Sequence, residues 1–377
     1  MACILKLPTK NGKGVLTFTD RERDWFISKD KTLQEKILSL KDKWVIGMHH
    51  NWTTFASETN HVFDFAMYLE SYTGNLPLIP LAAINFAPAC FTPAQNEKFW
   101  DILYIARAVK FKSIPEFFKI IRNVYDLGKK YRVLLICPIP PYKWKERKST
   151  ARNIREVYDA MFTEEEKDLF TLLTTTYRDP IPFDDETLSY FYKSSRIFVH
   201  SSHKERQGRV TGNAWASGMP LVGLACTGTP LPRQLQIKPY FYEAKNYEDF
   251  TDLIDEAIAA SKNNDTNWSP VTNLFRETES VKRLRAELKK FFASKNIPYE
   301  ESGEAFKHLA RRLARHHGKE SVMDIRMPLS QFIDTIIQYP EKVKNAAETG
   351  EDPEKALMTM FPEARAKSVI EKLFRLR

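Results

Sequence analysis

The stretch FVHSSHKERQGRVTGNAWASGMPLV, from Phe198 to Val222, decides the fold of this chain. Apolar and β-branched residues predict a strand over 196–200, and a polar loop containing Gly208 follows it. A small-residue helix comes next, and residues 221–224 predict another buried strand. The result is one βαβ crossover whose loop follows the carboxyl end of a strand, where open parallel sheets bind ligands. An ordinary crossover with a solvated loop explains this pattern about equally well.

Strand and helix signals alternate on both sides of this stretch. The predicted strands are residues 15–18, 44–48, 76–83, 101–105, 133–137 and 240–242, and the predicted helices are residues 32–40, 61–72, 185–192 and 247–260, with one more that begins at Ser113 as N-cap. Asp30 or Thr32 and Asp184 or Asp185 are the expected caps of two of these helices. The alternation from residue 100 to 260 predicts an α/β fold with a doubly wound parallel sheet.

Length and composition indicate a globular chain of more than one domain. The chain has 377 residues, of which 43% are hydrophobic, and domains of about 150 residues are common. We predict a short amino-terminal region over 1–95, a Rossmann-like domain over 96–262, and an all-helical extension over 263–377. The helical periodicity in the extension covers residues 274–294, 304–317, 329–338 and 353–374.

Charge and cysteine content narrow the class of protein. The net charge of +9 and the pI of about 9.1 favour a polyanionic partner or an anionic small ligand. No run of 18 apolar residues predicts a membrane span. The four cysteines show neither disulfide nor zinc spacing, so we expect a cytoplasmic protein without a metal site; they are Cys3, Cys90, Cys137 and Cys226.

Two loops of the predicted sheet carry groups suited to a diphosphate. Arg107 and Lys112 follow one strand, and the segment from Glu205 to Asn213 follows another. Arg offers a planar fork to phosphate oxygens and Lys a compact charge, so the pair would neutralise a diphosphate. A carboxylate or amide near a helix start would hydrogen-bond sugar or ribose hydroxyls.

Over residues 80–262 the sequence resembles the donor-binding half of the retaining, family-4-type glycosyltransferases of the GT-B fold. Five pieces occur in that family's order. The first two are Ile84-Asn85 with Phe91-Thr92-Pro93, and Ala106-Arg107 with Lys112. The third is the acidic helix and strand of 185–199, and the fifth is the βα unit of 241–258. Between them lies a Glu-x7-Glu motif, whose matching residues are Glu205, Gly208, Val210, Ala214, Ala216, Gly218 and Pro220. The resemblance implies a GT-B-like fold.

The resemblance also implies roles for residues. Arg107 and Lys112 would hold the diphosphate of a nucleotide-sugar donor, and Glu205 would contact the transferred sugar. Gly208, Arg209 and Val210 would line the donor site beside them. The second Glu of the motif, which binds the ribose in the family, is Asn213 here. An Asn brings no charge and one acceptor oxygen fewer, so we expect a weaker or altered grip on the nucleoside.

The function implied is a metal-independent, retaining transfer of a sugar to a hydroxyl acceptor, with no cofactor besides the donor substrate. A modified base in DNA, or another polyanion, is one candidate acceptor because the chain is basic; a glycan or protein hydroxyl is another. A non-catalytic nucleotide-sugar-binding subunit is the competing class, given Asn213 and the short amino-terminal part. A dinucleotide-dependent enzyme is disfavoured because no G-x-G-x-x-G opens an early helix. The sequence leaves the oligomeric state open.

Two further features are weaker candidates. His49 and His50, at the end of a predicted strand, are either catalytic or acceptor-positioning groups or plain polar residues at a strand terminus. The helix over 304–317 has an apolar stripe and a basic remainder. We expect an ordinary amphipathic helix with a solvated basic side, and phosphate binding is the alternative; the basic residues are Lys307, Arg311, Arg312 and Arg315.

Overall fold

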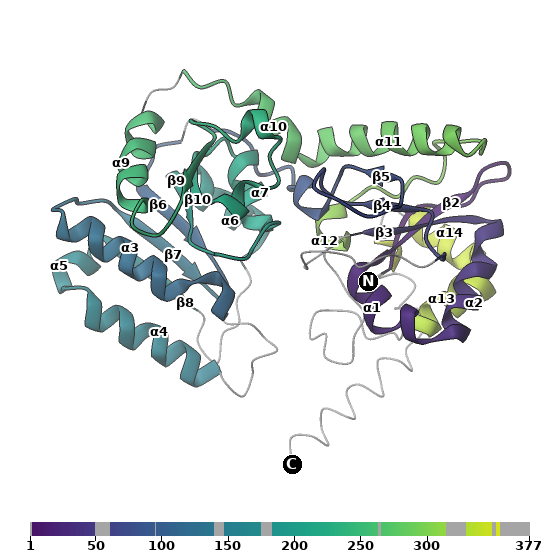
Figure 1. Cartoon of the computed structure of the whole chain (residues 1–377), viewed down its shortest axis with the longest axis horizontal. Coiled ribbons are helices and arrows are strands. Elements are labelled where there is room, and N and C mark those ends of the chain that lie inside the picture. Colours follow the sequence, from purple (N-terminus) through teal and green to yellow (C-terminus); the bar gives the residue numbers. More distant parts are fainter. Residues whose placement is uncertain are drawn as a thin grey trace, which may run out of the picture. The chain divides into compact units, whose positions relative to one another are not determined.

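The computed structural model describes residues 2–49, 61–94, 96–138, 147–174, 183–262, 265–313, 329–348 and 352–354. The chain folds into two compact units, in which unit 1 comprises residues 1–86 and 281–377 and unit 2 comprises residues 87–280. Each unit holds a sheet dominated by parallel strands, and helices flank it (Figure 1). The α/β fold class predicted from the sequence is confirmed, as is the helical character of the described carboxy-terminal region.

Unit 2 is built on a six-stranded sheet in which every pairing is parallel. Its strands are β6 Trp100–Ile105, β7 Val133–Cys137, β8 Phe170–Thr174, β9 Ser195–His200, β10 Leu221–Leu224 and β11 Phe241–Ala244. Their order across the sheet is β11-β10-β9-β6-β7-β8. The direction in which the sheet grows therefore reverses between β6 and β9, where Leu103 pairs with Phe198. Open α/β sheets bind ligands outside the carboxyl ends of the strands at such a switch point.

Helices connect these strands or follow the last of them. They are α3 Ile114–Asp126, α4 Arg147–Met161, α5 Glu164–Lys167, α6 Asp185–Lys193, α7 Arg209–Ala216, α8 Ala225–Gly228, α9 Phe250–Ser261 and α10 Ser269–Phe275, with 3-10 turns Lys110–Lys112 and Arg233–Leu235. Asp184 caps α6 by accepting a hydrogen bond from the amide of Thr187 at 2.7 Å, as predicted. Helix α3 buries its predicted apolar face, including Phe117 and Ile121, and packs beside α9.

Unit 1 contains a five-stranded sheet in the order β1-β2-β3-β4-β5. Its strands are β1 Cys3–Lys6, β2 Gly14–Thr19, β3 Trp44–His49, β4 Phe65–Met67 and β5 Leu78–Ile79. Strand β1 is antiparallel to β2, and the other pairs are parallel. The prediction of a helix over 61–72 was wrong, because that segment contains β4. All three residues of β4 are buried, and such a short, continuously apolar run carries no helical or strand periodicity.

Helices from both ends of the chain cover this sheet. They are α1 Asp20–Trp25, α2 Lys31–Ser39, α11 Glu277–Ser294, α12 Leu309–Leu313, α13 Leu329–Gln338 and α14 Pro340–Glu348, with 3-10 turns Ile27–Lys29, Leu40–Asp42 and Ala83–Asn85. Asp30 caps α2, accepting from the amide of Leu33. Ile46 of β3 belongs to the core that contains residues of α2 and α13, whereas its neighbour Val45 belongs to the core that contains residues of α11 and α12.

The carboxy-terminal helices are thus part of a sheet-containing unit, with α11 over one face of the sheet and α13 over the other (Figure 1). The boundaries of the two units also differ from the predicted division at residues 95 and 262. Parallel strands are buried on both faces, and the amino-terminal segment alone supplies too few helices to bury them.

The basic helix predicted over 304–317 is the short α12 within the described residues, and one of its basic side chains does not face solvent. Arg312 is fully buried, where its guanidinium pairs with Glu354 and donates to the backbone oxygen of Ile4. Burying an unpaired arginine costs a large amount of free energy, but here the Glu354 carboxylate compensates the charge of Arg312. The expectation of a solvated Arg312 was therefore wrong. Arg315, and residues 355–374 of the last predicted helix, lie outside the described residues.

Candidate functional site

Lys112 and Glu205 meet at the switch point of unit 2. Lys112 ends the 3-10 turn after β6, and Glu205 lies in the loop after β9. The Lys112 ammonium forms an ion pair with Glu205 Oε2. The two predicted loops therefore come together, because β6 and β9 are neighbours in the sheet, although Lys112 and Glu205 are 93 positions apart in the sequence.

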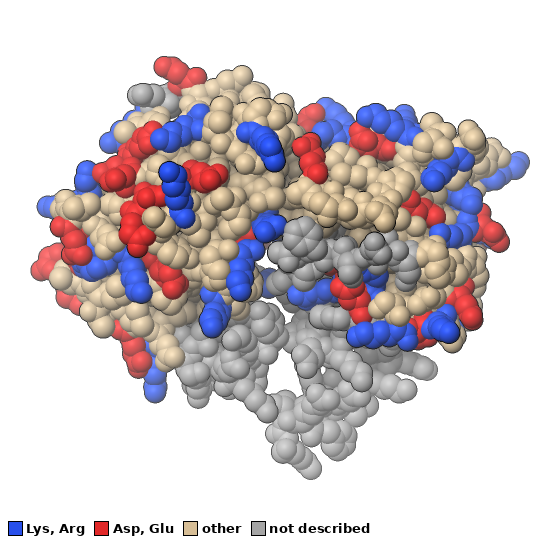
Figure 2. Space-filling model, in the orientation of Figure 1, with Lys and Arg blue, Asp and Glu red and all other residues tan. Residues whose placement is uncertain are grey.

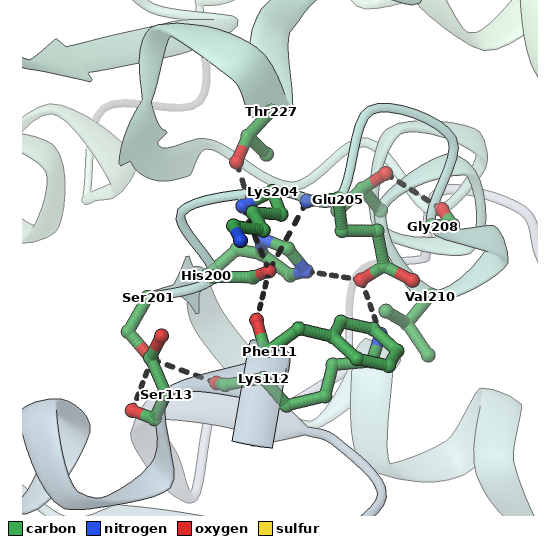
Figure 3. Close-up of polar contacts among 12 residues, drawn as sticks. Phe111, Lys112, Ser113, His200, Ser201, Lys204, Glu205, Gly208, Val210 and Thr227 are labelled. Atoms are coloured by element: carbon green, nitrogen blue, oxygen red, sulfur yellow. Dashed lines mark hydrogen bonds and ion pairs between the residues drawn. The ribbon is translucent and has the colours of Figure 1, made fainter. Parts of the chain in front are cut away.

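His200 holds the same carboxylate from the other side. It is the last residue of β9 and is fully buried. Its Nε2 lies 2.8 Å from Glu205 Oε2, and its Nδ1 lies 3.1 Å from Oγ1 of Thr227 in α8. Figure 3 shows the imidazole between these two residues. Groups from the ends of β6, β9 and β10 therefore form one connected chain of polar contacts.

The loops after β6 and β9 are tied together by their backbones. Ser201 Oγ donates to the backbone oxygen of Ser113 at 3.0 Å, and Ser202 Oγ donates to that of Phe111. Ser202 Oγ also accepts from the amide of Glu205 at 3.2 Å. After β11, Tyr247 donates its hydroxyl to the backbone oxygen of Ser201. These bonds fix the position of the Glu205 backbone before any ligand binds.

Ser113 does not cap α3 through its side chain, so that part of the prediction was wrong. Its backbone lies in the left-handed region, with φ of 53°, and its hydroxyl lies 3.0 Å from Nδ1 of His203. A left-handed backbone directs the Ser113 side chain away from the helix amides that an N-cap contacts. A non-glycine residue in this region costs free energy and is over-represented at functional sites.

Gly208 makes room for the Glu205 carboxylate. A Cβ placed on Gly208 would lie 2.9 Å from Glu205 Oε2 and 3.0 Å from its Cδ, closer than real Cβ contacts. The backbone φ of Gly208 is −65°, so close approach rather than unusual conformation explains the glycine here. The predicted pairing of Glu205 with Gly208 in one motif thus has a steric basis.

Electrostatics keep Glu205 ionised. Burial alone would raise the pKa of its carboxyl, but the Lys112 ammonium and the hydrogen bond from His200 outweigh burial and lower the pKa to about 2. Burial lowers the pKa of Lys112, the Glu205 carboxylate opposes this, and the charges of Arg107 and Arg209 lower it further. Burial also lowers the pKa of His200, which favours a neutral imidazole. Arg107 and Arg209 thus lie near enough to Lys112 for their charges to act on it, and together the three cations give the site an excess of positive charge suited to an anion.

The remaining predicted site residues lie on the same loops. Arg107 comes two residues after the end of β6, and Arg209 opens α7. The backbone oxygen of Val210 accepts from the Tyr192 hydroxyl at 2.9 Å. Asn213 lies in α7, one turn after Arg209, and is half-buried. Its side chain makes no hydrogen bond within the part of the chain that the structure describes.

His49 is a buried residue of unit 1. It lies at the end of β3, where its Nδ1 lies 2.9 Å from Thr17 Oγ1 and its Nε2 lies 3.1 Å from the backbone oxygen of Leu313. Burial lowers its pKa to about 3. These contacts make His49 a structural residue that joins β3 to α12. His50 lies outside the described residues.

Sequence reasoning missed His200, Thr227 and Tyr247. The sequence predicts His200 as the last residue of a strand, and Thr227, which contacts its Nδ1, lies in a different element, α8, so no local spacing marks the contact. Within the described ranges, no cluster of three His, Cys, Asp or Glu side chains is placed to hold a metal ion. None of the described helices combines the length and apolarity of a membrane span.

Comparison with known proteins gives structural likeness only. The sequence matches no protein-family model and no curated protein sequence. Similar solved structures include the pneumococcal O-GlcNAc transferase GtfA in complex with UDP and GlcNAc, at 13% identity and a TM-score of 0.44, covering 68% of this chain and 54% of that one. TarM has 12% identity and a TM-score of 0.47, covering 66% and 50%. Sucrose-phosphate synthase from Thermosynechococcus elongatus has 16% identity and a TM-score of 0.44, covering 68% and 70%. The chain thus spans about half the length of the first two.

Proposed function

We propose that this chain is a retaining glycosyltransferase that transfers a sugar from a nucleotide-diphosphate sugar to a hydroxyl acceptor. The observation that carries the proposal is the ion pair of Lys112 with the ionised carboxylate of Glu205 at the switch point of a parallel sheet, with Arg107 and Arg209 near enough for their charges to act on Lys112. The cations supply the charge for a diphosphate, and the carboxylate supplies an acceptor for sugar hydroxyls.

In this proposal Arg107 and Lys112 stabilise the negative charge that develops on the leaving diphosphate. Fixed cations in a partly buried site do this without reorganising during the reaction. The proposed reaction is therefore independent of metal ions. Gly208, Arg209 and Val210 line the start of α7 beside the diphosphate, and Asn213 lies one turn further on, toward the ribose.

The acceptor is proposed to be a hydroxyl on a modified base in DNA, with a glycan or protein hydroxyl as the alternative. The net charge of +9 supports a polyanionic acceptor. On the face shown in Figure 2, Lys and Arg side chains are interspersed with Asp and Glu. Any DNA contact is therefore expected to neutralise few phosphates and to weaken only moderately as salt is added. All four cysteines are free, which supports the proposed cytoplasmic location.

Ligand binding is the first test. The full-length chain is heated with UDP, GDP or ADP and with their glucose and mannose conjugates, and the shift in Tm is recorded. We expect one nucleoside to raise the Tm, and Arg107→Ala to raise the Kd of that nucleoside diphosphate about tenfold or more. An unchanged Kd in Arg107→Ala would contradict the placement of the diphosphate.

Transfer assays then distinguish an enzyme from a non-catalytic nucleotide-sugar-binding subunit. The second possibility is favoured by Asn213, which stands in place of the motif's second Glu. The donor that binds is incubated with oligosaccharides and with duplex DNA containing 5-hydroxymethylcytosine, with and without EDTA. We expect a product with the donor's anomeric configuration in both conditions. Donor binding with no turnover on any acceptor would support the non-catalytic subunit, and loss of activity in EDTA would contradict metal independence.

A further inference from the structure

The contacts of Glu205 divide its two carboxylate oxygens into different roles. Lys112 and His200 both donate to Oε2. Oε1 has no hydrogen-bond partner among the described residues, and the Glu205 side chain keeps 19% of its surface exposed. One oxygen is therefore committed to the protein, and the other is available to accept a hydrogen bond from a ligand.

The hydrogen-bond set of His200 fixes its tautomer. A carboxylate only accepts hydrogen bonds, so the proton on the ring must lie on Nε2, which faces Glu205. Nδ1 is then an acceptor, and the Thr227 hydroxyl donates to it. The direction of the contacts is from the Thr227 hydroxyl to the imidazole and from the imidazole to the carboxylate.

The imidazole has no freedom to leave this orientation. Its side chain is fully buried, and its ring packs edge-on against Tyr104 at 5.9 Å and stacks on Phe198 at 6.5 Å between ring centres. The backbone also leaves room for Thr227, because a Cβ on Gly223 would approach its side chain to 3.1 Å. A residue with no exposed surface cannot contact a substrate, so any effect of His200 must pass through Glu205.

We propose that His200, oriented by Thr227, is a positioning residue that holds Glu205 Oε2 and thereby presents Oε1 to a hydroxyl of the donor sugar. This deepens the proposed function and rests on it. The diphosphate is held by other side chains, so His200 affects the recognition of the sugar and not that of the nucleoside diphosphate. Selective loss of sugar recognition is the property that a merely structural histidine would not show.

The test compares two amides at position 200. In His200→Gln the amide nitrogen reaches about the position of Nε2 and can donate to Glu205, whereas in His200→Asn it reaches only about the position of Nδ1. For each variant, the Kd is measured for UDP-glucose and UDP, for GDP-mannose and GDP, and for ADP-glucose and ADP. We expect His200→Asn to weaken the nucleotide sugar about tenfold while the nucleoside diphosphate changes less than about twofold. His200→Gln should recover most of the loss, and Thr227→Val should show a smaller loss in the same direction.

Tyr158→Phe provides the matched control for stability. The Tyr158 hydroxyl is buried in the same unit and donates to the backbone oxygen of Phe170, the first residue of β8. That bond lies at the amino end of a strand, away from the carboxyl ends that carry the site. Tyr158→Phe should lower the Tm and leave the affinity ratio of nucleotide sugar to nucleoside diphosphate unchanged.

An independent readout covers the case in which a variant does not fold. Nitrogen-15 NMR of labelled wild-type protein should show a neutral histidine protonated at Nε2, with a signal that disappears in His200→Gln and persists in Thr227→Val. A neutral ring protonated at Nδ1 would overturn the proposal. The proposal would also be overturned if His200→Asn lowered the affinity for nucleotide sugar and for nucleoside diphosphate by the same factor, or changed neither affinity. Failure of the wild-type protein to bind any nucleotide would overturn the proposed function instead, and the NMR result would still decide the tautomer.

Discussion

Lys112 and Glu205 lie 93 positions apart in the sequence and form an ion pair where β6 and β9 end as neighbours in one sheet. In this structure the proposed diphosphate-binding cation and the proposed sugar-binding carboxylate therefore contact each other. A donor would have to share the Lys112 ammonium with Glu205. The following predictions test how each partner contributes.

Lys112→Met removes the ammonium and keeps an apolar side chain of similar length. We expect the Kd of the bound nucleoside diphosphate to rise about tenfold or more, because a charged contact is worth roughly 1.5–3 kcal/mol. The variant should also unfold at a lower urea concentration, since Glu205 loses its counter-charge. Lys110→Met, at an exposed position in the same turn, is the control in titration calorimetry. Equal effects at the two positions would remove Lys112 from the site.

Glu205→Gln keeps the shape of the side chain and removes its charge. The nucleoside diphosphate should bind as well as to the wild type or better, because a negative charge beside it disappears. The nucleotide sugar should lose about tenfold in affinity, since a charged acceptor becomes neutral. Glu243→Gln, exposed on β11, is the control. Weaker binding of the nucleoside diphosphate by Glu205→Gln would contradict the separate roles assigned to Lys112 and Glu205.

Gly208→Ala should displace the Glu205 carboxylate by a few tenths of an ångström, because the new methyl group would meet Oε2 at 2.9 Å. We expect about a threefold to tenfold loss in affinity for the nucleotide sugar alone, from a weakened contact worth about 1 kcal/mol. Gly128→Ala is a useful control. Its φ of 73° makes the substitution strained, but nothing lies within 4 Å of the new methyl group. Gly128→Ala should therefore lower stability without changing the affinity ratio.

His49 should make unit 1 less stable in acid. Its folded pKa of about 3 lies below the ordinary value of 6.5, so between these values the unfolded chain binds a proton that the folded protein does not. The free energy of unfolding should therefore fall as pH decreases from 6.5 toward 3, by up to about 1.4 kcal/mol per pH unit for one proton. Urea unfolding of His49→Gln across this range should show a smaller slope than the wild type. Parallel curves would mean that His49 is not buried in its neutral form.

Arg312→Met should be among the more damaging substitutions in unit 1. It leaves the buried Glu354 carboxylate without its counter-ion, and breaking such pairs costs about 3–5 kcal/mol. The double variant Arg312→Met with Glu354→Met should be more stable than Arg312→Met alone, because no buried charge remains unpaired. Arg311→Met, at the exposed neighbouring position, is the control in urea unfolding. A double variant less stable than the single one would contradict this account.

The sequence contained enough information to predict five of the six strands of the unit 2 sheet, because these are short apolar runs bounded by helix caps such as Asp184. It did not reveal the edge strand β8, which is only partly buried. The sequence also predicted that the loops carrying Lys112 and Glu205 belong to one site, since both loops follow strands of one parallel sheet. It could not reveal the contact of His200 with Thr227, which depends on how the end of β9 packs against α8. Nor could it place Arg312, because the partner Glu354 lies 42 positions away and periodicity describes one helix at a time.

The order of synthesis has a consequence for unit 1. Its strands β1 to β5 are synthesised before unit 2, but most of α11 and all of α12 and α13, which cover the two faces of that sheet, are synthesised only after unit 2. At about 5–20 residues per second, the residues between positions 86 and 281 delay these helices by roughly 10 to 40 s. Unit 2 can complete its core during that interval, whereas the nascent sheet of unit 1 must wait with exposed apolar faces. We expect chaperone binding to concentrate on residues 1–86 during translation.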